Sequence, residues 1–149
     1  MIYLLDTDIL IFMVRGLKPG RRQGQRQRAW ELVERCRQAQ AAGDTVGLSA
    51  VTISELEFGA QNSTDYETEI AAVHKVLVPF DLFDYSAVLC APQYGRIRHH
   101  LDRKGQTFGS MDLLIAAHAL ALDATLVTNN LAHFSRVPGL KTVNWNLGS

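Results

Sequence analysis

The chain opens with Ile2-Tyr3-Leu4-Leu5-Asp6-Thr7-Asp8, and this stretch indicates the fold class more strongly than any other. Four apolar or aromatic residues in succession are typical of a short strand that is buried in a parallel sheet. Asp6 ends this run directly. Ligands of open α/β sheets bind at the carboxyl ends of the strands, and an acid buried there is costly unless a partner compensates its charge. We therefore expect Asp6 to belong to a functional site.

Strand and helix patterns alternate along the whole chain, which predicts a three-layer α/β fold with a central, mostly parallel sheet of four to five strands flanked by helices. The predicted strands cover residues 2–5, 46–48, 80–83, 124–127 and 141–143. The predicted helices cover residues 7–14, about 27–42, 50–59 after the N-cap Ser49, 65–78, 86–104 with Pro92 near its first turn, and about 111–122. A length of 149 residues predicts a single domain over residues 1–149.

The composition is that of a globular protein, with 47% hydrophobic residues. The longest apolar stretch is far shorter than the ~20 residues of a membrane span, and the start lacks the basic region of a signal peptide. Cys36 and Cys90 form neither a CxxC motif nor a disulfide-dense pattern. We therefore expect a cytoplasmic protein with two reduced cysteines and no membrane association.

Two further acids stand in apolar surroundings, Glu55 in VTISELEFG (51–59) and Asp112 in GSMDLLIAAHAL (109–120). Two carboxylates about 4 Å apart repel each other by about 4 kcal/mol at an effective dielectric constant of 20. Such groups either raise one another's pKa values or capture a cation. Each acid also has a structural interpretation: Asp6 as a helix N-cap, Glu55 as a solvated acid, and Asp112 as a first-turn acid that meets the helix dipole.

Four segments in order resemble the PIN domain, and within it the VapC-type ribonuclease toxins of bacterial toxin–antitoxin pairs. They are IYLLDTDIL (2–10), SAVTISELEFG (49–59), GSMDLLIAAHAL and ATLVTNNLAHF (124–134), and the closing GLKTVNW (139–145) fits as well. The resemblance implies an endoribonuclease that depends on Mg²⁺ or Mn²⁺ and hydrolyses RNA, with transfer RNA as the expected target. It also implies a VapB-like antitoxin that blocks the site, and a homodimer or a larger toxin–antitoxin assembly.

Residue by residue, Asp6, Glu55 and Asp112 match the three acids that serve this family as metal ligands and catalytic residues. A fourth position often carries aspartate in the family, whereas this chain has Asn129 and Asn130. The resemblance thus implies that Asn130 assists with a neutral oxygen, and it leaves open whether one or two ions bind. The hydroxyl residues Thr7 and Ser110 also have two interpretations. Each can bond a site carboxylate or water, or can simply cap a helix.

The net charge is zero, but the basic residues are concentrated in two segments. Residues 15–28, RGLKPGRRQGQRQR, predict an exposed loop rich in arginine, and residues 96–104 are basic as well. Because arginine pairs bidentately with phosphate, we expect Arg21, Arg22 and Arg98 to contact RNA. The same arginines can instead be solvated surface or meet an acidic antitoxin segment.

The histidines form no metal-binding motif, so a zinc site is not expected. His99 and His100 are adjacent and would point apart on a helix, while His118 is expected to be a hydrogen-bonded core residue. His74 and His133 are expected to be isolated.

Two other functions remain open at this stage. Asp6-Thr7-Asp8 after a hydrophobic strand also resembles the nucleophile motif of haloacid-dehalogenase-type phosphatases. That family needs a downstream lysine and an acidic pair at a strand end, and the segment ATLVTNN offers no such pair. The second alternative is a PIN scaffold that binds RNA or protein without cleaving RNA, for which Asn130 is the main argument.

Overall fold

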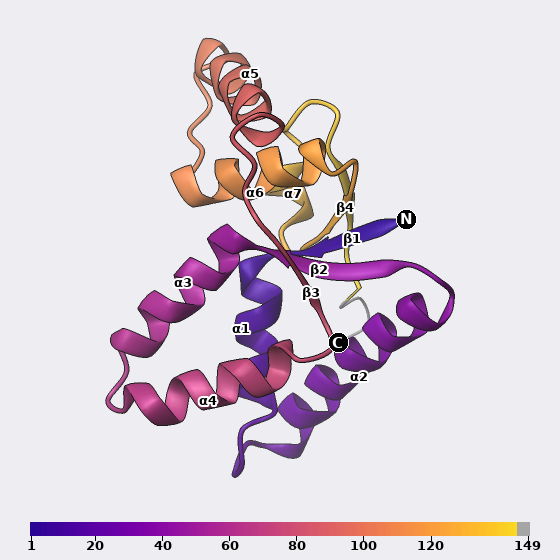
Figure 1. Ribbon diagram of the computed structural model, residues 1–149, viewed down its shortest axis with the longest axis vertical. Helices are drawn as coiled ribbons and strands as arrows, with labels where there is room; N and C mark the ends of the chain where they lie inside the picture. The colour runs from indigo at the N-terminus through magenta and orange to yellow at the C-terminus, as the bar shows by residue number, and fades with distance from the viewer. Residues whose placement is uncertain (146–149) are drawn as a thin grey trace.

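A five-stranded parallel sheet forms the centre of the protein in the computed structural model, which describes residues 1–145 (Figure 1). The strand order is β3-β2-β1-β4-β5, and every neighbouring pair is parallel. The strands are β1 (Ile2–Leu5), β2 (Thr45–Ser49), β3 (Asp81–Phe83), β4 (Thr125–Val127) and β5 (Lys141–Val143). The predicted α/β fold with a parallel sheet flanked by helices is confirmed.

The register of the central strands brings Asp6 next to the end of β4. Leu5 pairs with Val127, and the backbone N–H of Asp6 donates to the carbonyl of Val127 at 2.9 Å. Asp6 and Thr128 therefore follow neighbouring strands at the same edge of the sheet. This carboxyl edge is where ligands bind in open parallel sheets.

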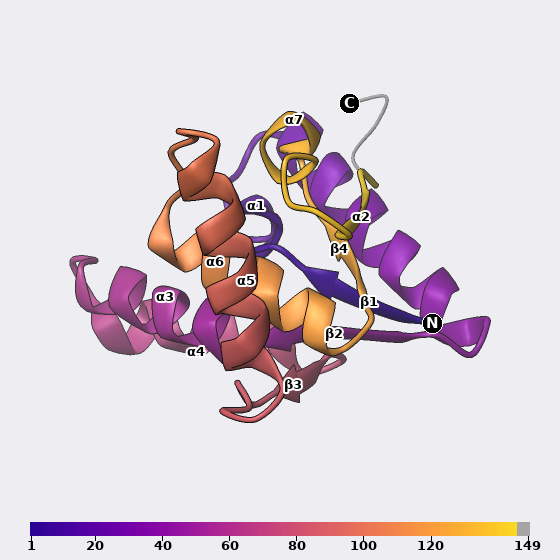
Figure 2. The same cartoon turned by 90° about the horizontal axis from the view of Figure 1, so that it is seen from above.

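Helices cover both faces of the sheet (Figures 1 and 2). One group is α1 (Thr7–Gly16), α2 (Gln23–Ala41), α3 (Ala50–Gln61) and α4 (Tyr66–Leu77). The other group is α5 (Cys90–Arg103), α6 (Ser110–Ala121) and the short α7 (Leu131–Phe134). The order of the layers is thus helix, sheet, helix, as the alternating sequence pattern predicts.

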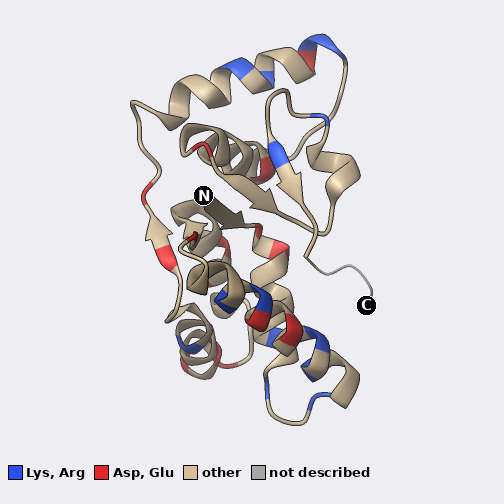
Figure 3. Ribbon diagram, turned by 90° about the vertical axis from the view of Figure 1, so that its right-hand side faces the viewer, with Lys and Arg blue, Asp and Glu red and all other residues tan. Residues whose placement is uncertain are grey.

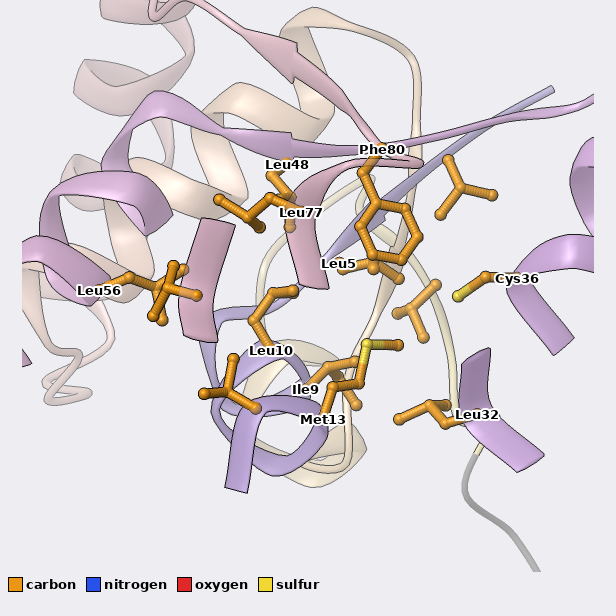
Figure 4. Packing of buried hydrophobic residues seen from close by; sticks show 14 of the residues in the cluster. Leu5, Ile9, Leu10, Met13, Leu32, Cys36, Leu48, Leu56, Leu77 and Phe80 are labelled. Carbon is orange, nitrogen blue, oxygen red and sulfur yellow. The ribbon is translucent and has the colours of Figure 1, made fainter. Parts of the chain in front are cut away.

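Two apolar clusters hold these layers together, one on each face of the sheet. Side chains of α1 such as Ile9, Leu10 and Met13 are fully buried among residues of β1, β2, α2 and α4 (Figure 4). Ile115 of α6 and Leu126 of β4 are fully buried in the second cluster, which also includes Ile97 of α5. Because β1 contributes Leu5 to the first cluster and Leu4 to the second, it is buried on both faces, and Asp6 directly follows this fixed strand.

All predicted strands and helices are present, with errors at some boundaries, and the short helix α7 was not predicted. The predicted loop 15–28 is wrong at both ends, since α1 continues to Gly16 and α2 begins at Gln23, so that residues 17–22 connect the two helices. The Gln/Arg segment is helical because Ala29 and Leu32 anchor α2 to the core. Helix α5 begins at Cys90 rather than residue 86, with Pro92 in its first turn as predicted.

Two further expectations concern the state of the cysteines and helices that could span a membrane. Cys36 and Cys90 are both buried free thiols, as expected. Within residues 1–145, no helix has the length and the apolar character that a membrane span requires.

Candidate metal centre

Asp6 is the most deeply buried of the predicted site acids, with 3% of its surface exposed. Its Oδ1 accepts a hydrogen bond from the backbone N–H of Thr7 at 2.8 Å, so it caps α1 as one interpretation of the sequence requires. Its Oδ2 accepts from the Thr128 hydroxyl at 2.9 Å. Both carboxylate oxygens are therefore fixed in direction by groups from two neighbouring parts of the sheet edge.

Burial raises the pKa of Asp6 from 3.8 to about 6, because water is removed from around the carboxylate. The hydrogen bond from Thr128 lowers this pKa, whereas the negative charges of Asp8 and Asp112 raise it further. The effect of these two charges on Asp6 indicates that the three acids share one neighbourhood at the sheet edge. A cation placed there would relieve both the desolvation and the repulsion.

Glu55 is joined to the start of α1 by a hydroxyl relay. The Thr7 hydroxyl donates to Glu55 Oε1 at 2.7 Å and lies 2.9 Å from the Thr52 hydroxyl. Thr7 thus holds Asp6 by its backbone and Glu55 by its side chain. Two of the predicted site acids are therefore bonded to the same threonine.

Asp112 lies in the first turn of α6 and contacts a histidine that the sequence did not single out. Its Oδ2 is 3.0 Å from His133 Nε2, and the side chain is 41% exposed. His133 Nδ1 in turn lies 2.7 Å from an Nη of Arg136. The expectation that His133 is isolated was therefore wrong, because α7 folds back across the edge of the sheet and presents it to α6.

Asn130 is exposed and precedes α7, and its backbone N–H donates to the Thr128 hydroxyl at 3.0 Å. The Thr128 hydroxyl in turn donates to Asp6 Oδ2. Asn130 thus reaches the site through its backbone, while His133 is the side chain of this segment that contacts an acid.

The described residues offer carboxylate donors but no closed cage. Within residues 1–145, no group of three or more His, Cys, Asp or Glu side chains is arranged to hold a metal ion. Mg²⁺, however, is usually bound through one or two carboxylates together with several waters and substrate phosphate. Asp6 is buried, and the half-exposed Asp112 lies near enough to raise the pKa of Asp6, so this pair of carboxylates fits such an ion.

Two of the predicted substrate-contacting residues line one hollow beside this site. Arg98 on α5 and Ser110 at the start of α6 border a hollow of about 370 Å³ that also includes Phe108, the ring stacked on His133. Arg98 donates to the Tyr94 hydroxyl at 3.0 Å and lies 3.8 Å from an oxygen of Asp102. Ser110 is exposed in the first turn of α6, where Gly109 and not Ser110 is the N-cap.

Arg21 and Arg22 lie in a different part of the molecule, in the connection between α1 and α2. Both are exposed. Figure 3 shows how the basic residues are distributed over the fold. Asp6 stands at the opposite end of α1, and ten helical residues span about 15 Å. The structure thus separates these two arginines from Asp6, whereas Arg98 shares a hollow with Ser110, at the start of the helix that carries Asp112.

The sequence did not indicate one residue of the candidate site, His133. Thr128 carried a signal, since it directly follows a buried strand as Asp6 does. His133 carried none, because its contact with Asp112 spans 21 positions and depends on how α7 packs. His118, in contrast, is a buried core histidine bonded to the Ser49 hydroxyl at 2.7 Å, as expected.

Comparison with known proteins places this geometry in a family. Residues 3–140 match the PIN domain. Ribonuclease VapC2 of Rickettsia felis is 34% identical over 146 residues, which cover 98% of this chain and 99% of the relative. The tRNA(fMet)-specific endonuclease VapC of Shigella flexneri is 34% identical over 144 residues, covering 97% and 98% of the two chains.

Solved structures agree with this assignment. The structure of VapBC2 from Rickettsia felis bound to a DNA fragment from their promoter contains a chain with a TM-score of 0.84 and 32% identity, covering 97% of this chain and 99% of that one. The DNA-bound VapBC from Salmonella typhimurium gives a TM-score of 0.81 at 31% identity, covering 97% and 98%. This chain therefore belongs to the PIN-domain family, among its VapC-type members.

Proposed function

We propose that this protein is an endoribonuclease that depends on Mg²⁺ or Mn²⁺ and acts as the toxin of a toxin–antitoxin pair. The observation that carries the proposal is the buried Asp6 at the carboxyl edge of a parallel sheet, with Asp112 near enough to raise its pKa. The family supplies the reaction class, because the VapC relatives are named as ribonucleases.

Each site residue has a defined task in this proposal. The three acids Asp6, Glu55 and Asp112 would hold the cation directly or through water. Thr7 orients Asp6 and Glu55, and Thr128 also orients Asp6, by the hydrogen bonds described above. When bound, the cation lowers the pKa of a water and neutralises charge on a phosphate oxygen. Asn130 stabilises the turn that carries Thr128, and Ser110 and Arg98 border the hollow where RNA would approach.

Transfer RNA is the proposed substrate class, and the initiator transfer RNA is its most specific form. This refinement rests on the relative named tRNA(fMet)-specific endonuclease, which is 34% identical to this chain. A folded transfer RNA presents single-stranded loops, whose phosphates and splayed bases are accessible to a shallow site.

The test compares cleavage of initiator and elongator methionine transfer RNA by purified protein in Mg²⁺, Mn²⁺ or EDTA. The variant is Asp6→Asn, which keeps size and the ability to cap α1. The matched control is Asp123→Asn, in an exposed turn with a left-handed backbone (φ 53°) that asparagine tolerates.

Wild type and Asp123→Asn are expected to cut the initiator transfer RNA in Mg²⁺ or Mn²⁺, and EDTA and Asp6→Asn are expected to abolish cutting. Cleavage that survives both EDTA and Asp6→Asn would contradict the metal-dependent mechanism. Tight RNA binding without any cleavage would favour the non-catalytic scaffold.

A groove between α1, α2 and α4 is the proposed docking site for part of a VapB-like antitoxin. It has a volume of about 610 Å³ and combines apolar residues such as Trp30, Val33 and Val76 with the cations Arg26 and Lys75. Trp30 remains 46% exposed. An amphipathic antitoxin helix with acidic flanks would match this lining, since such helices bury their apolar face in a groove.

The antitoxin assignment can be measured with Val76→Asp, which places a charge in the apolar floor of the groove. The variant is expected to lose the stable complex with the cognate antitoxin but to keep RNA cleavage. An intact complex would exclude this groove as the docking site.

Three further expectations extend the proposal: a single PIN domain over residues 1–149, a homodimer or larger toxin–antitoxin assembly, and action in the cytoplasm. The exposed apolar residues Val88 and Leu89 before α5 suit a protein contact. Sedimentation of the free toxin is expected to give the mass of two chains, and a monomer would exclude the dimer.

A further inference from the structure

We propose that His133 is a positioning residue for Asp112. It donates a hydrogen bond from Nε2 to Asp112 Oδ2, and Arg136 fixes the direction of that bond. Asp112 is thereby oriented with its other oxygen available for the cation. This inference rests on the proposed function, because it assigns a task to Asp112 in the metal site.

We call the chain of hydrogen bonds from Arg136 through His133 to Asp112 the relay. Its direction follows from the chemistry of Arg136. Arg136 has only N–H donors, and one of its Nη atoms lies 2.7 Å from His133 Nδ1. The Nδ1 atom must therefore accept, which leaves the hydrogen of a neutral imidazole on Nε2. Nε2 lies 3.0 Å from Asp112 Oδ2 and is the donor of that bond.

Arg136 is itself held by backbone groups on two segments. Its Nε donates to the carbonyl of His133 at 3.1 Å, and the same Nη donates to the carbonyl of Thr107 at 3.2 Å. The guanidinium thus ties α7 to the connection between α5 and α6. The relay joins the two segments that carry His133 and Asp112.

Aromatic packing fixes the imidazole plane as well. The ring of His133 stacks on Phe108 with centroids 4.0 Å apart and an angle of 17°, and the Arg136 guanidinium lies 4.9 Å from the Phe108 centroid. The ring of Phe134, which is 1% exposed, anchors α7 below them. A ring held by stacking and by bonds at both nitrogens has little freedom to rotate.

The same bonds exclude a simple metal-ligand role for His133. A histidine binds a metal through a nitrogen lone pair, but Nδ1 accepts from Arg136 and Nε2 carries the hydrogen. His133 therefore acts on the cation through Asp112. Hydrogen-bonded partners of ligating carboxylates affect metal affinity in this way.

The test uses a pair of variants that differ in where they place an amide N–H. Gln at position 133 puts its amide nitrogen near the place of Nε2, whereas Asn puts it near the place of Nδ1. Mn²⁺ affinity is measured by calorimetry on metal-free protein, and cleavage of transfer RNA is measured in parallel. His74→Asn, in an exposed position of α4, is the control.

His133→Asn is expected to weaken Mn²⁺ binding about 10-fold to 100-fold. His133→Gln and His74→Asn are expected to stay close to wild type, since the first keeps the donor to Asp112 and the second lies outside the relay. A purely structural histidine would instead give equal losses in the Gln and Asn variants, measured as lower melting temperatures without a specific loss of Mn²⁺ affinity.

A second readout is the nitrogen NMR spectrum of the His133 ring in metal-free protein. Wild type is expected to show the tautomer with hydrogen on Nε2, and Arg136→Met is expected to show a mixture of tautomers. An Nδ1–H tautomer in wild type would overturn the relay.

The positioning role of His133 and the proposed function can be contradicted separately. If wild type binds Mn²⁺ and cuts RNA while His133→Asn matches it in both, the positioning role is wrong and the proposed function stands. If wild type neither binds Mn²⁺ nor cuts RNA, the proposed function is wrong, and the role of His133 falls with it.

Discussion

Asp6 and Asp112 face the same region but are held in opposite ways. Asp6 is 3% exposed and follows a strand that is buried on both faces, with a backbone N–H and a threonine hydroxyl fixing its oxygens. Asp112 has a side chain that is 41% exposed and is held by His133 from a helix of only four residues. The fold fixes the first acid, and side chains position the second.

The two acids therefore differ in the free-energy cost of their charged form and in the freedom of their side chains to turn. Burial makes the charged form of Asp6 costly, as its raised pKa shows. The exposed Asp112 is solvated and can be turned by its partner without disturbing the core. We infer that Asp6 sets where a cation binds and that Asp112 and His133 set how tightly it binds.

The largest expected effect is the loss of RNA cleavage in Asp6→Asn and in Asp112→Asn. Loss of a cation that stabilises charge in the transition state costs several kcal/mol, or a factor of about a thousand or more in rate. Single-turnover cleavage rates in Mn²⁺ would measure it. Near-normal cleavage by either variant would remove that acid from the site.

The next effect distinguishes the two acids by the stability of the metal-free protein. The pKa of Asp6 is about 6 in the folded state against 3.8 ordinarily, so between these pH values the folded protein binds more protons than the unfolded chain. The contribution of Asp6 to stability should therefore fall as the pH rises from about 4 to about 6 and remain lower above it, by roughly 3 kcal/mol.

Denaturant unfolding in EDTA over this pH range measures the effect. Asp6→Asn should remove this pH dependence and unfold at higher denaturant than wild type at pH 8. Asp112→Asn should keep the pH dependence. The same pH dependence in wild type and in Asp6→Asn would show that Asp6 is not destabilised by burial.

A smaller effect is expected from Thr128→Val, which removes the donor to Asp6 Oδ2 and the acceptor of the Asn130 N–H. Loss of bonds to buried polar groups costs about 1–3 kcal/mol. The loss should be larger at pH 8 than at pH 4, because the charged Asp6 depends more on that donor. Thr125→Val on β4, the strand that Thr128 follows, is the control, and equal losses in both variants would contradict the role of Thr128.

The smallest effect concerns RNA contacts. Arg21→Ala with Arg22→Ala is expected to weaken RNA binding and flatten its salt dependence, and Arg98→Ala to do the same from the hollow beside Asp112. Each lost phosphate contact changes the slope of log K against log salt by about 1. Filter binding at several salt concentrations with an Asp6→Asn background checks this, and an unchanged slope in a variant removes its arginines from the interface.

The features that were predictable from the sequence are those that a local pattern encodes. An apolar run ended by a charge indicated β1 and Asp6, and the alternation of strand and helix patterns along the chain indicated the parallel sheet. The start of α2 was misplaced because Gln and Arg dominate its first turns, and its helical state depends on Ala29 and Leu32 packing into the core. Packing of this kind leaves little trace in a local pattern.

The partners of the acids were hidden for a similar reason. The bond between Asp112 and His133 joins residues 21 positions apart, and the bond between Asp6 and Thr128 joins residues 122 positions apart. Strand register creates the second contact and the docking of α7 creates the first. Apolar surroundings and the resemblance to the PIN domain pointed to the acids, while only the tertiary structure identifies what orients them.

The most direct test is an anomalous difference map from crystals of the protein grown with Mn²⁺. We predict a peak at the carboxyl edge of the sheet, within coordination distance of Asp6 and with Asp112 as its ligand directly or through one water. A well-occupied peak elsewhere, with Asp6 still bonded only to Thr7 and Thr128, would contradict the account.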